Sequence, residues 1–392
     1  MDHIHRMHAA NNPMNYIHQQ KDWPRFRWNE GRLLPLLAKV RHQQGRLLGQ
    51  MEGLGFHLRG EANLESLTSE VIGSSAIEGE KLNAEEVRSS IARRLGIAQA
   101  GMTPASRHIE GIVEMMIDAT RKFKEALTAE RLFSWHAALF PTGRSGMQRI
   151  SVGAWRSEAV GPMQVVSGAM GRERMHFEAP EAHLLAAEIA LFLEWFEGAK
   201  AIDPVLKAGI AHFWFVTIHP FEDGNGRIAR AIADMALARA DGVADRFYSM
   251  SAQIERERKQ YYDSLESSQR SDMDITLWLV WFLGCLQRAL EQAQENLQSI
   301  LNKARIWERI HQDGPVNERQ HAVINRLLDG FEGKLSTSKY AKLAKCSQDT
   351  ALRDINELIV RRILAREAGG GRSTGYCFTD LRAGDGFKFD KP

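Results

Sequence analysis

The chain has 392 residues, more than one ordinary domain uses, and 44% of them are hydrophobic, which is enough to build a sizeable core. Its 51 basic residues nearly balance its 49 acidic ones, which excludes a surface built entirely for nucleic acid but not a local basic patch. The three cysteines are scattered without CxxC spacing, so neither a disulfide framework nor a zinc site is indicated, and a reducing, cytoplasmic location is expected.

The two stretches that could suggest export or a membrane do not support either. The N-terminal stretch is polar, rich in histidine and without an apolar segment, so residues 1–20 are expected to form a flexible tail and not a secretory signal. The most apolar run, Ile275–Leu286, is too short to span a bilayer and predicts a buried helix. No membrane contact is therefore expected.

Helical periodicity dominates the chain from residue 29 onward. It predicts helices over 29–55, 63–78, 103–123, 128–140, 181–197, 204–218, 226–242, 251–268 and 274–303. Asn63 is expected to cap one of these helices, and Thr103-Pro104 to start another. Gly79 and Gly242 are expected to end helices, because glycine readily takes the left-handed conformation found there.

Residues 150–180 depart from the helical pattern. The stretches "MQVVSG" and "ERMHFEA" read as two short strands around a Gly-rich turn, which predicts a β-hairpin. A hairpin inserted in a helical body is often a lid or a binding edge.

The C-terminal part differs again. From about residue 317 the pattern predicts helices over 319–329, 337–344 and 348–360, then two strands around a Gly-Arg-Ser turn. That order predicts a winged helix-turn-helix over 317–392, after a linker near 303–317. The expected recognition helix would start at a Ser347 cap and present these residues outward: Gln348, Asp349, Arg353, Asp354, Asn356 and Glu357.

The acids on that helix are poorly suited to phosphate contact, and Arg366 and Arg372 on the wing are better candidates. Contact with protein, including a homodimer partner, is therefore favoured over DNA binding, although DNA stays a candidate partner.

The segment Ile218–Arg230, "IHPFEDGNGRIAR", concentrates the functional chemistry of the chain. Its Gly-Asn-Gly turn permits positive φ and close backbone approach just before a helix N-terminus, where unpaired N–H groups favour an anion. Arg227 and Arg230 are three residues apart, so they share a helical face, and each guanidinium can donate two hydrogen bonds to phosphate oxygens.

Two further residues complete the set. Asp223 is an oxygen ligand suited to Mg²⁺ shared with nucleotide phosphates, and His219, at the end of the preceding helix, can serve as a general base. Together these are the parts that phosphoryl or nucleotidyl transfer needs. The alternative, a capped turn with two surface arginines and a core histidine, does not explain why all the elements coincide.

"HPFEDGNGRIAR" resembles the HxFx(D/E)GNGRxxR motif of the Fic (Fido) family at every specified position. Fic proteins are helical with a β-hairpin flap, and most characterised members transfer AMP from ATP to a hydroxyl side chain of a protein. The resemblance implies that His219 deprotonates a Ser, Thr or Tyr hydroxyl of the target, which attacks the α-phosphate and releases pyrophosphate. It also implies that Phe221 anchors the loop and that Asp223 holds Mg²⁺.

The same resemblance assigns the phosphate contacts. Gly224, Asn225 and Gly226 would form the anion hole, and Arg227 and Arg230 would take the β- and γ-phosphates of ATP. The hairpin would be the flap and would bind the target segment by strand addition. Four of its residues would lie near the nucleotide: Ser167, Gly168, Ala169 and Met170.

A Tyr-Tyr pair also matches the family, which commonly places one near the adenine. Tyr261 and Tyr262 would take that place, with ordinary helix packing as the alternative. Gln269 stands where some relatives have Asn, which leaves its adenine contact open.

The stretch "SSAIEG" ahead of the motif suggests a brake. Ser74 and Glu78 are four apart and share one helical face, and Glu78 stands just before the Gly79 stop, at the end of the helix dipole where a carboxylate is disfavoured. A solvated glutamate is the alternative. The stretch resembles the (S/T)xxxE(G/N) inhibitory motif of Fic proteins, which implies an ion pair between Glu78 and Arg230 that blocks productive ATP binding.

The predicted fold class is mainly α: a Fic-type helical core over 103–303 with a β-hairpin flap, an N-terminal helical domain over 21–102 that includes the inhibitory helix (about 63–79), and a C-terminal winged helix-turn-helix. Residues 23–53 resemble the N-terminal domain of some bacterial Fic proteins. The leading hypothesis is a self-inhibited, Mg²⁺-dependent protein adenylyltransferase that uses ATP. The alternatives are use of another nucleotide, removal of AMP, and a transcription regulator whose Fic core only senses a nucleotide.

Overall fold

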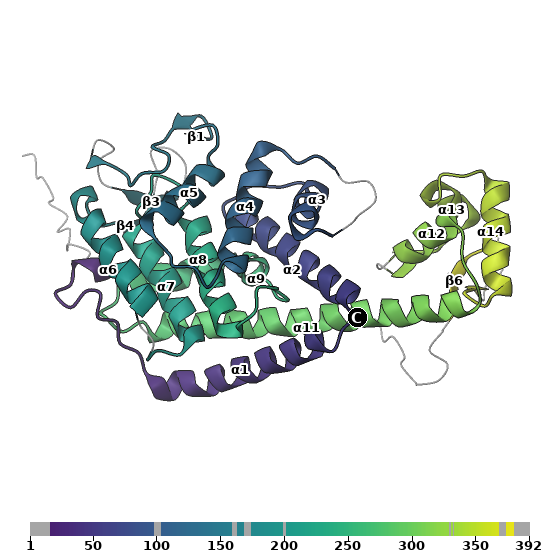
Figure 1. The fold of residues 1–392 in the computed structure, drawn as a ribbon, viewed down its shortest axis with the longest axis horizontal. Coiled ribbons are helices and arrows are strands. Elements are labelled where there is room, and N and C mark those ends of the chain that lie inside the picture. Colours follow the sequence, from purple (N-terminus) through teal and green to yellow (C-terminus); the bar gives the residue numbers. More distant parts are fainter. Residues whose placement is uncertain are drawn as a thin grey trace, which may run out of the picture. The chain divides into compact units, whose positions relative to one another are not determined.

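The computed structural model describes residues 16–97, 103–158, 163–167, 174–198, 201–328, 331, 333–367 and 374–379. The chain divides into two compact units, Met1–Glu295 and Asn296–Pro392, and helix α11 (Thr276–Gln312) runs from the first into the second (Figure 1). Both units are mainly helical, which confirms the predicted fold class. The other elements of the first unit are η1 (Ile17–Gln19), α1 (Glu30–Glu52), α2 (Phe56–Ile77), α3 (Ala84–Leu95), α4 (Arg107–Arg121), α5 (Ala129–Leu139), β1 (Arg144–Ser145), β2 (Gln148–Arg149), β3 (Gln164–Ser167), β4 (Arg174–Glu178), η3 (Ala182–Leu184), α6 (Leu185–Gly198), α7 (Pro204–Ile218), α8 (Asn225–Asp241), α9 (Met250–Arg256) and α10 (Arg258–Gln269).

Helices α7 and α8 form the buried centre of the first unit. Almost every side chain of both is buried, which is typical of helices surrounded on all sides. Helices α2, α4 and α5 contact α8, and α6 contacts α7, as Figure 1 shows. The motif lies where α7 ends and α8 begins, so the core of the unit holds it from both sides.

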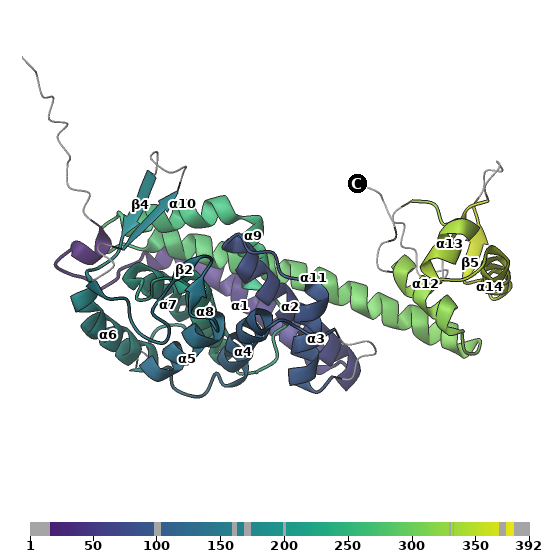
Figure 2. The same ribbon diagram turned by 90° about the horizontal axis from the view of Figure 1, so that it is seen from above.

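Helix α1 lies along the part of α11 that belongs to the first unit (Figure 2). The backbone N–H of Asn29 donates a 2.8 Å hydrogen bond to Thr276 Oγ1, and Gln43 Nε2 donates a 3.1 Å bond to Glu291 Oε1. Asn29 also caps α1, because its side chain accepts a bond from the backbone N–H of Arg32. None of the helices in the described ranges has both the length and the apolar character needed to cross a bilayer.

Tyr16 and His18, which were expected to belong to a flexible tail, pack against Phe177 of the hairpin instead. Tyr16 and Ile17 are buried, and the Tyr16 ring meets Phe177 of β4 edge-on at 5.1 Å between centroids. The prediction failed because the apolar partner of Tyr16 is distant in sequence and cannot be read locally. Residues 1–15 lie outside the described ranges.

Two helix starts were predicted wrongly. Helix α2 begins at Phe56 after an N-cap at Gly55, so Asn63 is inside the helix, where its buried side chain accepts a 2.9 Å bond from the backbone N–H of Arg246. Helix α4 begins at Arg107 with Ser106 as its cap, not at Thr103. In both cases several residues could cap locally, and tertiary contacts decide which one does.

Other helix limits also differ from the prediction. The helix expected over 251–268 is two helices, α9 and α10, which are separated at Glu257. Helix α11 continues to Gln312, past the expected end at 303, and the short helix α3, capped by Asn83, was not predicted. The expected left-handed stops at Gly79 (φ 84°) and Gly242 (φ 73°) are confirmed.

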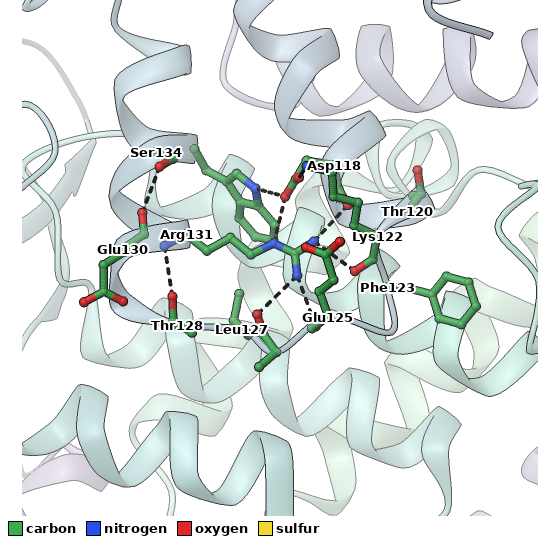
Figure 3. Close-up of polar contacts among 12 residues, drawn as sticks. Asp118, Thr120, Lys122, Phe123, Glu125, Leu127, Thr128, Glu130, Arg131 and Ser134 are labelled. Carbon is green, nitrogen blue, oxygen red and sulfur yellow. Dashed lines mark hydrogen bonds and ion pairs between the residues drawn. The ribbon is translucent and has the colours of Figure 1, made fainter.

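A single arginine holds the turn between α4 and α5 (Figure 3). Arg131 Nε donates a 2.7 Å bond to Asp118 Oδ2, and Arg131 Nη2 donates a 3.1 Å bond to Lys122 O. Trp135 Nε1 donates to the same Asp118 oxygen at 2.8 Å. Because the last carbonyls of α4 lack partners within the helix, these bonds fix the start of α5, whose other end carries His136.

The predicted hairpin is present. Strands β3 and β4 pair antiparallel from Gln164 opposite Glu178 to Ser167 opposite Arg174, and β4 lies beside α10 (Figure 2). A second, two-residue hairpin, β1 with β2, was not predicted. Gly168, Ala169 and Met170 of the expected nucleotide contact lie outside the described residues.

The second unit has the predicted element order. After α11 come α12 (Glu318–Leu328), α13 (Thr337–Leu343), α14 (Gln348–Val360), β5 (Leu364–Arg366) and β6 (Tyr376–Phe378). β5 and β6 pair antiparallel, and Ser347 caps α14 as expected. The prediction that Asp354 faces outward is wrong, because it is buried and pairs with Arg319 at 2.8 Å. The winged helix-turn-helix assignment itself stays a prediction.

Candidate active site

His219 is the residue that ends α7. Its backbone is left-handed (φ 51°, ψ 59°), a conformation that costs a residue other than glycine about 1–2 kcal/mol. Its Nδ1 lies 3.2 Å from Val216 O, and since a carbonyl can only accept, Nδ1 carries the proton and Nε2 is left to accept one. Burial lowers the pKa of His219 to about 4, so the ring is neutral at pH 7 and able to act as a base.

Phe221 and Asn225 hold the loop that follows. Phe221 is fully buried, and its ring stacks on His136 at 4.2 Å between centroids. The Asn225 side chain accepts a 2.9 Å bond from the Phe221 N–H and donates a 2.8 Å bond to the Phe221 carbonyl. Asn225 therefore acts as a clamp within the loop, a contact that its sequence position did not reveal.

Neighbouring atoms lie so close to Gly224 and Gly226 that a side chain would not fit at either position. Gly224 is left-handed (φ 81°), and a Cβ there would come within 2.9 Å of the Phe140 ring. A Cβ on Gly226 would collide with the Glu78 carboxylate. Helix α8 begins at Asn225, so its first N–H groups lack carbonyl partners within the helix and can bind an anion.

Arg227 and Arg230 are both almost fully buried. The Arg227 guanidinium lies 5.1 Å from the centre of the Phe140 ring, and its Nη1 is 3.5 Å from Glu80 Oε2. His108 hydrogen-bonds Glu80, and that bond together with Arg227 lowers the pKa of Glu80. The first motif arginine thus has its own acidic neighbour, which sequence reasoning missed.

Arg230 is bound to the residues of the predicted brake. Its Nη2 donates to Glu78 Oε1 at 2.8 Å and to Ser74 O at 2.9 Å, and its Nε donates to Ser74 Oγ at 2.9 Å. Burial opposes the charge, but Glu78 together with Tyr261 and Tyr262 outweighs it, so the pKa of Arg230 is raised. Nη1 of Arg230 is buried without a hydrogen-bond partner among the described residues. The predicted pairing of Glu78 with Arg230 is present in the structure.

A cavity of about 770 Å³ lies over these groups. Helices α2, α7, α8 and α10 and both hairpin strands contribute to its wall. The lining residues are Glu78, Val165, His176, Phe177, Val216, His219, Gly226, Arg258, Lys259, Tyr261, Tyr262, Asp263, Leu265, Glu266 and Gln269. The base, the motif turn, the brake glutamate, the hairpin and the tyrosine pair therefore share one space.

The two tyrosines differ in their surroundings. Tyr261 is buried, its hydroxyl lies 3.0 Å from His212 Nε2, and burial raises its pKa, all of which fit a packing role. Tyr262 is 39% exposed and is the member of the pair with a ring available to a ligand. Gln269 is buried and donates a 3.2 Å bond to Thr217 Oγ1.

Asp223 can be tested as the Mg²⁺ ligand by its surroundings. It precedes the Gly224 turn and accepts a hydrogen bond from Ser145 of β1. No cluster of three His, Cys, Asp or Glu side chains that could hold a metal occurs in the described ranges. A single carboxylate beside a phosphate-binding turn still fits Mg²⁺, which commonly takes one or two carboxylates together with substrate phosphates.

Sequence reasoning also missed Arg156, which touches the motif from outside. Arg156 is buried, and its Nε donates a 2.8 Å bond to His219 O. The surrounding "AWR" carries no local signal for this contact, because its acceptor lies 63 residues further along the chain.

Comparisons with known proteins agree with this geometry. Residues 126–237 match the Fic/DOC family, and residues 16–97 match a domain of unknown function (DUF4172). The chain resembles, over 91% of its length, a crystal structure of a Fic family protein from Desulfovibrio desulfuricans G20, with a TM-score of 0.52, 21% identity and 97% of that chain covered. The helical core with this hairpin and loop has the Fic fold, and residues 126–237 carry the match to the Fic/DOC family.

Curated relatives are named protein adenylyltransferases. The chain is 24% identical over 247 residues to protein adenylyltransferase fic-1 of Caenorhabditis briggsae, which covers 61% of this chain and 45% of the relative. It is 23% identical over 241 residues to protein adenylyltransferase Fic of Aedes aegypti, covering 59% of this chain and 42% of that protein. The chain thus spans less than half the length of these relatives.

Proposed function

We propose that this protein is a self-inhibited protein adenylyltransferase, which transfers AMP from ATP to a Ser, Thr or Tyr hydroxyl of a protein and releases pyrophosphate. The observation that carries the proposal is that His219, Gly226 and Tyr262 line one cavity together with Glu78, which is bound to Arg230. The names of the curated relatives point to the same chemistry.

The residues divide the work of the reaction as follows. His219 Nε2 accepts the proton of the target hydroxyl, which then attacks the α-phosphate. The first turn of α8 receives the phosphates through its free N–H groups, and Arg227 and Arg230 neutralise them. Asp223 would hold Mg²⁺, and the metal ion would supply further charge neutralisation. The edge of the hairpin would align the target chain by strand pairing.

The brake acts through occupation of a single side chain. Glu78 and Ser74 take three of the bonds of Arg230, and the Glu78 carboxylate stands against Gly226, at the start of the anion-binding turn. A phosphate therefore meets both a negative charge and an arginine that is already bound. Removal of the carboxylate takes away that negative charge and one of the three bonds that hold Arg230.

The test compares four proteins in self-modification with labelled ATP and Mg²⁺. Glu78→Gly is expected to incorporate far more label than wild type, and Glu78→Gly with His219→Ala is expected to incorporate none. Glu85→Gly is a matched control, because Glu85 is an exposed glutamate of the neighbouring helix α3 and should leave labelling unchanged. Equal labelling by wild type and Glu78→Gly would show that the brake is assigned wrongly.

The alternative of a DNA-binding regulator has less support. The exposed face of α14 combines Asp349, Arg353 and Glu357 with the exposed apolar side chains of Leu352 and Val360, a surface better suited to protein than to phosphates. A gel shift with the full chain tests it. Sequence-specific DNA binding without AMP transfer by Glu78→Gly would favour the regulator.

A further inference from the structure

Arg156 lies outside the motif but makes three hydrogen bonds around it. Its backbone N–H donates a 2.9 Å bond to Pro220 O, its Nε donates a 2.8 Å bond to His219 O, and its Nη2 donates to Pro180 O. The side chain is only 4% exposed. All three acceptors are backbone carbonyls.

These carbonyls have few other donors available. His219 ends α7 in a left-handed conformation, so its carbonyl points out of the helix and cannot be satisfied within it. Pro220, the next residue, has no backbone N–H and therefore cannot donate a hydrogen bond to a nearby carbonyl. A buried carbonyl without a donor is costly, and a cation is favourable at the negative end of a helix dipole. The guanidinium of Arg156 satisfies both demands at once.

The cost of this arrangement suggests that it serves the site. Among the described residues Arg156 has no ion pair with an acidic side chain, and burial lowers its pKa. A buried cation held only by dipoles is expensive, and such broken rules gather at functional positions. A neutral donor such as glutamine could satisfy a carbonyl without carrying the charge.

Arg156 also connects the base to the hairpin. It stands at the start of the segment that leads into β3, and its Nη2 contact, Pro180, follows β4 by two residues. At the same place the Ala179 N–H donates a 2.9 Å bond to Met163 O and closes the hairpin. One side chain therefore ties the β4 end of the hairpin to the backbone of His219.

We infer that Arg156 is a positioning residue, which fixes the orientation of the His219 ring and holds it in register with the base of the hairpin. The inference rests on the proposed function, in which His219 is the base and the hairpin aligns the target.

The charge of Arg156 gives the inference a second readout. Burial is the main cause of the low pKa of His219, and the hydrogen bond to Val216 O raises that pKa. Three charged groups face the ring. Arg156 lowers the pKa of His219, whereas Glu78 and Asp223 raise it. Loss of the cation should therefore move the His219 pKa upward, from about 4 towards the ordinary value of about 6.5. Arg156→Lys, which keeps the cation, separates this loss of charge from a loss of burial.

The experiment uses two substitutions in the full chain carrying Glu78→Gly. Arg156→Met removes the charge and the bonds, and is expected to lower kcat for labelling by about 100-fold while KM for ATP stays near that of the parent. It is also expected to move the acid limb of the pH profile upward. Arg156→Lys retains the charge but lacks the planar guanidinium that donates to two carbonyls at once. The kcat of this variant should fall in part, and the acid limb of its pH profile should stay in place.

Controls separate this inference from the proposed function. Arg149→Met, on exposed strand β2, should match the parent, and circular dichroism checks that each variant folds. NMR titration of His219 measures the shift of its pKa independently of activity. If Arg156→Met does not fold, Arg156→Lys is compared with the parent instead. Loss of the guanidinium that donates to two carbonyls should then change the Nδ1–H signal of His219. If Glu78→Gly itself transfers no AMP, the proposed function fails while the titration still reports on Arg156. An unshifted His219 pKa, or a rise in KM for ATP with kcat unchanged, overturns the inference.

Discussion

Gly73 offers a way to weaken the brake without touching its carboxylate. It lies in α2 one residue before Ser74, where α2 packs closely on α9. A Cβ at this position would stand 2.6 Å from Ala252 N and 2.8 Å from both Ala252 Cα and Ser251 C. These are backbone atoms, which cannot turn away as a side chain can. Gly73→Ala must therefore push α2 and α9 apart.

The magnitude follows from two opposing effects. Overpacking of this kind costs about 1–3 kcal/mol, whereas replacing glycine by alanine inside a helix gains about 0.5–1 kcal/mol. The difference is a net loss of up to about 2.5 kcal/mol in the free energy of unfolding, with a central value of about 1 kcal/mol. If that strain is relieved by moving the C-terminal end of α2 away, each 1.4 kcal/mol raises the released fraction about tenfold. Self-modification with labelled ATP should rise accordingly.

A second glycine of α2 provides the control. At Gly60 a Cβ would meet only the Ile97 side chain, at an ordinary 3.8 Å. Gly60→Ala should therefore raise the unfolding free energy by about 0.5–1 kcal/mol and leave labelling unchanged. Urea denaturation and the labelling assay read both variants. If Gly73→Ala is as stable as Gly60→Ala, or if it loses stability without any gain in labelling, the proposed link between α2 docking and inhibition is refuted.

Two more predictions concern stability. Burial and the neighbouring carboxyl of Glu70 raise the pKa of Asp234 despite the nearby Arg246. Asp234 therefore stabilises the fold at pH values below its unfolded pKa of about 4, and this stabilisation is lost as the pH rises through the higher folded pKa. Asp234→Asn should flatten the fall in unfolding free energy above about pH 4; urea denaturation across pH checks this, and equally steep curves would contradict it. Phe221→Ala removes the ring that stacks on His136 and should cost about 3–5 kcal/mol in the same assay, while a loss below about 1 kcal/mol would mean that the loop is anchored elsewhere.

Much of the local structure could be predicted because its signals are local. Thr128 caps α5, Ser347 caps α14, and Gly79 and Gly242 end their helices in the left-handed conformation, since each cap depends on one side chain and its own backbone. The hairpin over β3 and β4 was also predicted, because its alternation and its Gly-rich turn lie in one segment.

Predictions failed where long-range contacts decide. Asn63 has the chemistry of a cap, but it lies in a helix interior because Arg246 offers its backbone N–H as a distant partner. Asp354 was expected at a surface and is buried, since Arg319 of another helix neutralises it. The helical signal of α3 was overlooked, although Asn83 and Gly96 mark its ends.

The sequence by itself determined the chemistry of the motif, because the residue types at 219–230 already combine a base, an anion-binding turn and two phosphate-binding cations. Only the tertiary structure revealed the contacts that no motif marks. Glu80 reaches Arg227 across 147 positions and Arg156 reaches His219 across 63, distances over which sequence spacing carries no information. The physical reason is that buried charges and carbonyls must find partners wherever the packing of helices brings them.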